Sequence, residues 1–560
     1  MAGSLSSRNS RTMKGQKNSY QKLFYYINFV SFCLLALVFF SLYCHNLTSF
    51  SQDLGRHLKL GEIIVQQKNI PKTNLFSYTY PDFPFINHHW LSEVIFFITA
   101  KSFGLSSLII LKIIFCSLAF FSLIFLTAKN QGQIISLGWS LIILLIFSQR
   151  SEVRPEIFSY FFLSIFLILL NNKQSFYKYF FILPLIQILW VNSHIYFFLG
   201  PVLILIFFLN NLIFYQFKDK ITLLSLFTFF LVSITSFINP NFINGALFPL
   251  SVFKNYGYQI VENQSVFFMS NYFHKLYNPK FVFIFLISLL SFIPIFIKKI
   301  NLNNQIVFNL GCFIFFSFLG FLAIRNTPIF ALTSLVIISK NLFFIKKPLA
   351  SKLSLESNIN LKFLFYIIFI PLCLFLAYQN LSNQKNISNL SDRRFGLGKI
   401  KAAENGTNFI LDNEINGPVF NNFDIGSFLI YKLYPQYQVF VDGRPEAYPA
   451  SFFQQTYIPM QENEEKWQEV DNKYNFNFIF FSHTDITPWA ISFLKQIYKN
   501  KSWRLVFLDD YVIIFVKNNG QNKNIIQKYS IDIEKYNFPC HQSLDCYARI
   551  KRISNILIYN

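Results

Sequence analysis

Long runs of apolar residues fill the chain between residues 24 and 378. A helix that crosses a bilayer core needs roughly 20 mostly apolar residues. Eleven segments, give or take two, approach that length, namely 24–44, 105–128, 133–149, 156–171, 179–193, 194–215, 221–238, 280–297, 305–324, 327–345 and 360–378. Composition agrees, since 53% of the residues are hydrophobic and only 14% are charged. The sequence therefore predicts a polytopic α-helical membrane protein.

The charges of the loops predict how these spans are oriented. If the tail 1–23 is cytoplasmic, sixteen Lys and Arg residues fall on the inner side, against only Arg150, Arg154 and Arg325 in the short loops opposite. Cytoplasmic loops carry the cation excess of membrane proteins, so we expect the N-terminus inside and the C-terminus outside. This bias explains much of the net charge of +22, and no nucleic-acid partner is needed to account for it.

This orientation places two loops and the C-terminal part outside the cytoplasm. The loops are 45–104 and 239–279, both within the membrane domain 24–378, and the remaining residues, 379–560, are predicted to form a small extracytoplasmic α/β domain. Its predicted strands are 418–421, 437–444, 476–482, 504–510 and 511–517, and its predicted helices are 398–411, 424–433, 463–472 and 486–499. We expect the last two strands to form a hairpin around Asp509 and Asp510.

The first outer loop holds the densest group of polar residues. It opens with SQDLGRHLKLGE (51–62), and its pattern predicts two helices on the membrane surface, 54–67 and 90–103, joined by a Pro- and Asn-rich turn region and an extended aromatic piece. The side chains of this loop that could take part in catalysis or binding are those of Asp53, Arg56, His57, His88, His89 and Glu93. Polar residues thus converge at the outer face of the membrane.

An N-terminal span, an early Asp in the first outer loop, and the motifs GRHLKLGE, NIPKTNLFSYT and NHHWLSEV together resemble the bacterial multi-spanning GT-C glycosyltransferases of the RgtA/B/C/D-like group. Weaker similarities lie at RSEVRPEIFSYFF, WVNSHIYFFLG, INPNFINGALFP, RNTPIFAL and VDGRPEAYP. The resemblance implies a GT-C fold and an enzyme in the plasma membrane. Such an enzyme moves a hexose or pentose, with inversion, from a polyprenyl-phosphate donor to a lipid, glycan or protein acceptor at the outer face.

The implied reaction assigns roles to particular residues. It needs a carboxylate that takes the proton of the acceptor hydroxyl, and cations that stabilise the departing lipid phosphate. Asp53 is the predicted base. The predicted phosphate-binding residues are Arg150, Arg154 and Arg325, because the Arg fork matches phosphate oxygens and outer-loop cations are disfavoured. The alternatives for these arginines are helix-end snorkelling or ion pairs with Glu152 and Glu156.

Further residues are predicted to support this site. Arg56, His57, His88, His89 and Glu93 are candidates for the first-loop part, and Asn192, His194, Glu262, Asp442 and Arg444 for cavity or acceptor contacts. The plain alternatives are a polar cap on a tight turn for Asn192 and His194, a solvated loop glutamate for Glu262, and an ion pair for Asp442 with Arg444.

The sequence leaves cofactor and bridge chemistry partly open. A divalent metal is a candidate cofactor. Many GT-C relatives have His-Glu-Trp where this chain has His88, His89 and Trp90, so the resemblance does not carry a metal role over to position 89 and leaves metal dependence open. Cys540 and Cys546 in CHQSLDC favour a disulfide over free thiols, and a metal site there lacks a fourth ligand at finger-like spacing.

Other functions share parts of this pattern. A polysaccharide polymerase or ligase has the same chemistry with another acceptor. A transporter of lipid-linked sugars would also combine many spans with interfacial arginines, but it should place polar residues near mid-membrane and show internal repeats, which the sequence does not clearly have. A non-catalytic scaffold leaves the first-loop cluster without a purpose.

Overall fold

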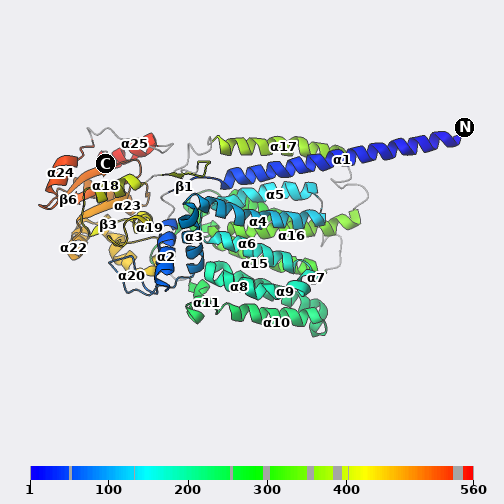
Figure 1. Cartoon of the computed structure of the whole chain (residues 1–560), viewed down its shortest axis with the longest axis horizontal. Coiled ribbons are helices and arrows are strands. Elements are labelled where there is room, and N and C mark those ends of the chain that lie inside the picture. The colour runs from blue at the N-terminus through cyan, green and yellow to red at the C-terminus, as the bar shows by residue number, and fades with distance from the viewer. Residues whose placement is uncertain are drawn as a thin grey trace.

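The structure is a computed structural model that describes residues 2–48, 53–131, 133–251, 256–293, 303–349, 359–382, 394–400, 403–533 and 546–558. Figure 1 shows a bundle of nearly parallel helices, with the N-terminus at one end and a smaller mixed domain at the other. The long bundle helices are α1 (Ala2–Tyr43), α4 (Ser107–Gln131), α5 (Gln133–Phe147), α6 (Glu156–Leu170), α8 (Ile182–Ser193), α9 (Leu199–Tyr215), α10 (Lys220–Thr235), α13 (Pro279–Leu290), α15 (Asn304–Leu322), α16 (Thr327–Leu349) and α17 (Ile359–Leu381).

The bundle is that of a multi-pass membrane protein. Fewer of its described helices than the eleven predicted spans are long enough to cross a membrane. Each predicted segment overlaps one bundle helix. Within the described residues, six helices are long and apolar enough to cross a membrane, or seven if α6 and α7 (Lys173–Tyr179), bent by 114°, form one span. Several others, such as α8 and α13 with 12 residues each, are shorter than a bilayer core requires. The structure therefore supports six to seven candidate spans.

The first outer loop forms the two predicted surface helices, α2 (Leu54–Gln67) and α3 (Trp90–Phe103). Figure 1 shows both lying across the end of the bundle, next to the C-terminal domain. Two glycines allow α2 to pack closely on either side. A methyl group on Gly61 would collide with the carbonyl oxygen of Glu93 in α3, and one on Gly55 with that of Ser427 in α19 (Phe423–Leu433).

The C-terminal domain is built on a small mixed sheet. Its strands are β3 (Val419–Asn421), β4 (Phe478–Ser482), β5 (Trp503–Leu508) and β6 (Val512–Lys517), in the order β3-β4-β6-β5. β3 runs parallel to β4, and the other pairs are antiparallel. The β5–β6 hairpin and the helices α18 (Glu404–Asp412), α19, α22 (Glu464–Tyr474) and α23 (Pro488–Lys499) agree with the predicted elements.

Residues 437–444 do not form the predicted strand. Val439 makes only an isolated parallel bridge, with Ser77 of the first outer loop. The side chain of Asn421 takes the place of a neighbouring strand, because its Nδ2 donates to the Val441 carbonyl (2.7 Å) and its Oδ1 accepts from the Phe440 amide (2.9 Å). The apolar segment therefore leaves the sheet and lies beside the first outer loop.

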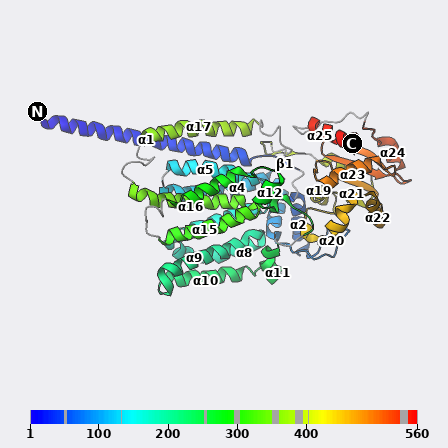
Figure 2. The same cartoon turned by 180° about the vertical axis from the view of Figure 1, so that it is seen from behind.

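The packed interior has two main parts. One apolar cluster fills the bundle, and the other fills the C-terminal domain. The second cluster also contains Leu60, Ile63, Phe76 and Phe85, so the first outer loop supplies part of the core of the C-terminal domain. Figure 2 shows α11 (Phe242–Ser251) and α12 (Val266–Tyr272), from the second outer loop, at the same end of the bundle.

Candidate active site

A cavity of about 140 Å³ lies where the bundle, both outer loops and the C-terminal domain meet. Ten sequence-predicted residues line it, namely Asp53, Arg56, His57, His88, His89, Arg150, Arg154, His194, Glu262 and Arg325. These residues are up to 272 positions apart in the sequence, which is the separation of Asp53 and Arg325. The fold gathers them because each lies in a loop or at a helix end on the same side of the bundle.

Asp53 lies immediately before α2 and points its carboxylate toward arginines. Its Oδ1 accepts a hydrogen bond from Arg56 Nη2 at 2.9 Å, and its Oδ2 is 3.8 Å from Arg154 Nη1. Burial acts to raise the pKa of the Asp53 carboxyl, but the charges of Arg56, Arg154 and His57 outweigh it and hold the pKa well below its usual range. Asp53 is therefore ionised at neutral pH, and 24% of its side chain stays exposed.

Glu93 does not line the cavity but lies behind it, fully buried at 0% exposure. Its Oε1 accepts from His57 Nδ1 at 2.8 Å, and its Oε2 accepts from Asn87 Nδ2 at 2.6 Å. Burial and the nearby Arg56 charge lower the pKa of His57, despite the opposing effect of Glu93. A neutral His57 therefore donates its Nδ1–H to Glu93, which orients the ring. Glu93 supports the site through His57 and does not face the cavity.

Four histidines line the cavity, with the rings of His57, His88 and His194 grouped around His89. Ring centroids are 5.4 Å apart for His57 and His89, 3.9 Å for His88 and His89, and 5.2 Å for His89 and His194. Burial lowers the pKa of His88 to about 3. Burial and the neighbouring histidines also lower the pKa of His89. In the described part of the chain, no group of three or more His, Cys, Asp and Glu residues is placed to hold a metal ion.

The outer-loop arginines form a network with two glutamates. Arg150 Nε donates to Glu156 at 2.7 Å, and Arg150 Nη1 lies 3.0 Å from Glu262 Oε2. Arg154 Nη1 donates to the same Glu262 oxygen at 2.9 Å. Burial acts to raise the pKa of Glu262, but the charges of these arginines lower it to about 2. The ion-pair alternative for Arg150 and Glu156 is thus present, and it coexists with exposure to the cavity.

Three cavity arginines also retain unused donors. Arg56 Nε, Arg150 Nη2 and Arg325 Nε are buried and have no hydrogen-bond partner among the described residues. A buried donor without a partner is costly, and such groups in folded proteins are usually satisfied by a ligand or water. Three guanidinium N–H groups around one cavity suit the oxygens of an anionic ligand such as a phosphate.

Three other predicted residues lie outside the cavity. Asn192 accepts from Trp90 Nε1 at 2.7 Å and donates to the Ile238 carbonyl at 2.8 Å, so it ties α3 to the bundle. Asp442 and Arg444 form a buried ion pair at 2.7 Å beneath the cavity wall. The predicted disulfide falls outside the described residues, because Cys540 and the side chain of Cys546 are not described.

Glu446 and Glu156 are cavity residues that sequence reasoning did not select. The motif VDGRPEAYP drew attention to Asp442 and Arg444, whereas the structure places their neighbour Glu446 in the cavity wall. Its position directly after Pro445 was the available signal, since Pro favours the second position of a turn. Glu156 was considered only as an ion-pair partner.

Comparison with protein-family models and with curated proteins finds no match to this sequence. Comparison with solved structures does. The archaeal oligosaccharyltransferase AglB from Archaeoglobus fulgidus, in complex with an inhibitory peptide and a dolichol-phosphate, matches with a TM-score of 0.58 and 12% identity over 88% of this chain and 74% of that chain. The chain has a GT-C-like fold.

Two other structures are also similar. An Archaeoglobus fulgidus oligosaccharyltransferase tethered with an acceptor peptide containing the NVT sequon matches with a TM-score of 0.58 and 12% identity, covering 89% of this chain and 74% of that one. ArnT from Cupriavidus metallidurans, bound to undecaprenyl phosphate, has a TM-score of 0.45 and 10% identity over 87% and 97%. The oligosaccharyltransferase similarity confirms the predicted fold at the GT-C level, and the RgtA/B/C/D-like grouping stays a prediction.

Proposed function

We propose that this protein is a membrane glycosyltransferase that moves a sugar from a polyprenyl-phosphate donor to a lipid, glycan or protein acceptor. The observation that carries the proposal is a single cavity that combines ionised Asp53 with four arginines, three of which keep a buried unpartnered N–H. The GT-C-like fold supports it, since the similar AglB structure contains a dolichol-phosphate. A polyprenyl phosphate offers the anionic oxygens that these arginines suit.

In the proposed reaction Asp53 acts as the general base. It accepts the proton of the acceptor hydroxyl while that oxygen forms a bond to the anomeric carbon of the donor sugar. The bond between the anomeric carbon and the phosphate oxygen breaks, and its electron pair leaves with the polyprenyl phosphate. Attack opposite the leaving group inverts the configuration of the anomeric carbon. The depressed pKa keeps the Asp53 carboxylate ionised at neutral pH but also makes it a weak base, so the proton should move late, once the attacking hydroxyl has become acidic by bonding to the anomeric carbon.

Arg150, Arg154 and Arg325 are the proposed phosphate-binding residues. Negative charge grows on the phosphate as the glycosidic bond breaks, and fixed guanidinium groups in a partly buried site stabilise that charge. Glu262 holds Arg150 and Arg154 in place through contacts of 3.0 and 2.9 Å. Both of these contacts are with arginines. We therefore propose that Glu262 positions the arginines and does not contact the acceptor.

We further propose that the protein lies in the plasma membrane with the cavity on the side opposite the cytoplasm. The N-terminus and the C-terminal domain, which supplies part of the cavity wall, lie at opposite ends of the bundle in Figure 1. Lys129, Lys173 and Lys340 gather around one hollow, lined by the ends of several bundle helices, as the cation excess of an inner face requires. Residues 24–378 then form the membrane domain and residues 379–560 the extracytoplasmic one.

Reconstitution with synthetic polyprenyl-phosphate hexoses and pentoses tests this function. Wild-type protein is expected to transfer at least one of these sugars to an acceptor in a lipid and glycan extract of a bacterial envelope. Asp53→Asn should lower the rate by about 10²- to 10⁴-fold, the usual contribution of a general base. Asp82→Asn is the matched control, because Asp82 is an exposed residue of the same loop.

The outcomes separate the proposals. Full activity of Asp53→Asn contradicts the assignment of the base but leaves the glycosyltransferase function standing. Failure of the wild-type protein to use any donor contradicts the function itself. Movement of the lipid-linked sugar across the reconstituted bilayer, without transfer, would instead support a transporter.

A further inference from the structure

One turn of the C-terminal domain forms part of the cavity wall. This turn, residues 443–446, is called the strap below, and its members Gly443, Pro445 and Glu446 line the cavity. Glu446 also lines a second hollow of about 460 Å³, which runs between the first outer loop, α11 and the C-terminal domain. Phe248 and Tyr256 border both spaces as well. Glu446 therefore lies in the wall that the second hollow shares with the candidate active site.

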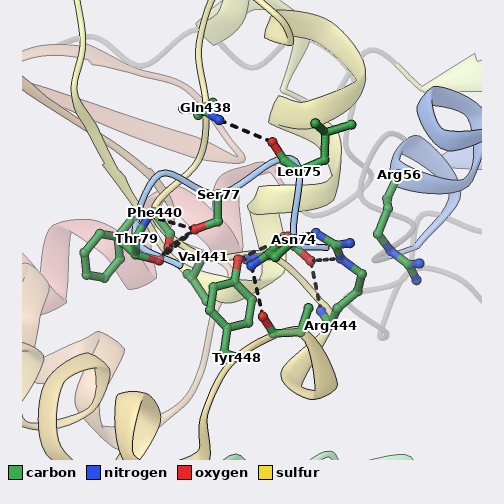
Figure 3. Close-up of polar contacts among 12 residues, drawn as sticks. Arg56, Asn74, Leu75, Ser77, Thr79, Gln438, Phe440, Val441, Arg444 and Tyr448 are labelled. Atoms are coloured by element: carbon green, nitrogen blue, oxygen red, sulfur yellow. Dashed lines mark hydrogen bonds and ion pairs between the residues drawn. The ribbon is translucent and has the colours of Figure 1, made fainter. Parts of the chain in front are cut away.

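A buried network fixes the strap. Arg444 donates to the two oxygens of Asp442, both at 2.7 Å, and its Nη2 also donates to Asn74 Oδ1 at 2.7 Å. Asn74 Nδ2 in turn donates to the carbonyl of Ala447 at 3.0 Å. Figure 3 shows Asn74 beside the Arg444 guanidinium, and the Arg444 side chain is 1% exposed. The backbone is thus held on both sides of Glu446.

The first outer loop clamps the segment that precedes the strap. Ser77 Oγ and Thr79 Oγ1 both donate to the Phe440 carbonyl, at 3.2 and 3.0 Å, and Gln438 Nε2 donates to the Leu75 carbonyl at 3.2 Å (Figure 3). The same loop contains Asp53. The position of Glu446 is therefore set relative to the proposed base, although the two residues belong to different parts of the sequence.

The Glu446 carboxylate differs from the other carboxylates of the cavity. Asp53, Glu156 and Glu262 each lie within 3.0 Å of an arginine nitrogen. Glu446 accepts a hydrogen bond from its own backbone amide, but no hydrogen bond or ion pair with the side chain of another described residue is present, and its side chain is half-buried. Burial raises its pKa, and the Arg56 charge and this hydrogen bond oppose the shift only in part. A carboxylate on a fixed backbone that keeps acceptor capacity free of other side chains is suited to bind a ligand.

We propose that Glu446 contacts the acceptor, receiving hydrogen bonds from hydroxyl groups of a carbohydrate acceptor that approaches through the second hollow. This inference rests on the proposed glycosyltransferase function and specifies its acceptor side. The walls of the hollow carry the rings of Phe83, Phe248, Tyr256 and Tyr448. Flat aromatic faces pack on the apolar C–H faces of sugar rings, while a carboxylate accepts from their hydroxyl groups. The combination favours a glycan or glycolipid acceptor.

The test compares transfer with hydrolysis of the donor by water in the same preparation. Glu446→Ala is expected to lower the ratio of transfer to hydrolysis about 10- to 100-fold, as loss of a hydrogen bond to a charged group does, and to raise the KM for the acceptor. Glu446→Asp keeps the carboxylate and should recover part of the ratio. Glu465→Gln, at an exposed position of α22, is the matched control and should leave the ratio unchanged.

Two outcomes of this assay overturn the inference. If Glu446→Ala lowers transfer and hydrolysis equally, the residue acts on the donor or on folding, which thermal unfolding of the variant distinguishes. If Glu446→Ala transfers as well as wild type, Glu446 has no acceptor role. A lowered ratio in a variant with an unchanged unfolding midpoint supports the inference.

A second measurement does not depend on turnover. Binding of methyl hexosides to the purified protein is followed by tryptophan fluorescence in wild type and in Glu446→Ala. Binding by wild type that the variant loses supports the acceptor site even if no polyprenyl donor is used, in which case only the proposed function fails. Equal binding by both proteins, or by neither, contradicts the carbohydrate assignment of Glu446.

Discussion

The two sides of the cavity are built on different principles. The bundle side presents Arg150 and Arg154 from a short loop between apolar helices, and both are balanced by Glu262. The C-terminal side presents Glu446 on a turn whose neighbour Arg444 is paired with Asp442 and Asn74, while the Glu446 carboxylate is paired only with its own backbone amide among the described residues. The difference suggests a division of work, with the donor phosphate recognised by the bundle and the acceptor by the C-terminal domain.

Helix α2 joins these two sides. Its residues Leu54 and Leu58 belong to the apolar cluster of the bundle, whereas Leu60 and Ile63 belong to the cluster of the C-terminal domain. Asp53 directly precedes this helix. The proposed base is therefore positioned by both cores at once, between the side that would bind the donor and the side that would bind the acceptor.

Of the changes that compare the two sides, the largest effect is expected on the bundle side. Arg154→Ala removes a guanidinium that contacts Glu262 and approaches Asp53, and it should lower kcat/KM for the donor by about 10²- to 10³-fold. Arg154→Lys keeps the charge without the planar fork and should recover only part of this loss. Inhibition by farnesyl phosphate should weaken in parallel, as measured in steady-state assays. Arg504→Lys, on β5, is the control, and unchanged inhibition of Arg154→Ala would argue against donor-phosphate binding on this side.

A smaller effect is expected at the junction. Gly61→Ala places a methyl group against the carbonyl oxygen of Glu93, so α2 must move away from α3. Overpacking of this kind costs about 1–3 kcal/mol and should lower the apparent unfolding midpoint in detergent. Gly520→Ala is the matched control, since a methyl group there meets no atom within 4 Å. An unaltered midpoint for Gly61→Ala would show that the junction is looser than the packing indicates.

The smallest effect is a dependence of acceptor binding on pH. The pKa of Asp53 lies well below its usual range and that of Glu262 is about 2, so both stay ionised from neutral to mildly acidic pH. Burial raises the pKa of Glu446, against the nearby charges of Arg56 and Arg444, so Glu446 is the first of the three carboxylates to gain a proton as pH falls.

Acceptor KM should therefore rise a few-fold as pH falls through the pKa of Glu446, while donor hydrolysis changes less. His88, with a pKa of about 3, stays neutral over this range and does not contribute. Initial rates at several pH values measure the change, and Glu446→Gln should abolish it. Persistence of the change in Glu446→Gln would assign it to another group.

Sequence reasoning anticipated much of the site because charged residues are rare in an apolar chain. Asp53 and Arg154 lie in short polar segments between long apolar runs, and loops on the same side of a bundle must come together. Glu446 was missed because the sequence does not show which carboxylate of this segment pairs with Arg444. Asp442, which looks equivalent in the sequence, forms that ion pair. Tertiary contacts decide which of two nearby carboxylates stays available.

The fold was anticipated best where local pattern decides it. The surface helices α2 and α3 and the β5–β6 hairpin agree with their predicted positions. Residues 437–444 have strand-like composition, yet the Asn421 side chain satisfies their backbone groups from within another segment. Such a substitution of a side chain for a strand has no periodic signature. The spans were harder to count because some described bundle helices, such as α8 with 12 residues, are shorter than a bilayer core requires.

The two glycines of α2 limit how the molecule can move. Gly55 brings the helix backbone against α19, and Gly61 brings it against α3, so each side is in direct backbone contact. A swing of the C-terminal domain about the bundle would therefore have to open the backbone contact between α2 and α19, or carry α2 and α3 along with it. In the second case Asp53, which directly precedes α2, would move relative to Arg154 of the bundle. The proposed donor and acceptor sides of the cavity are thus mechanically linked through one helix.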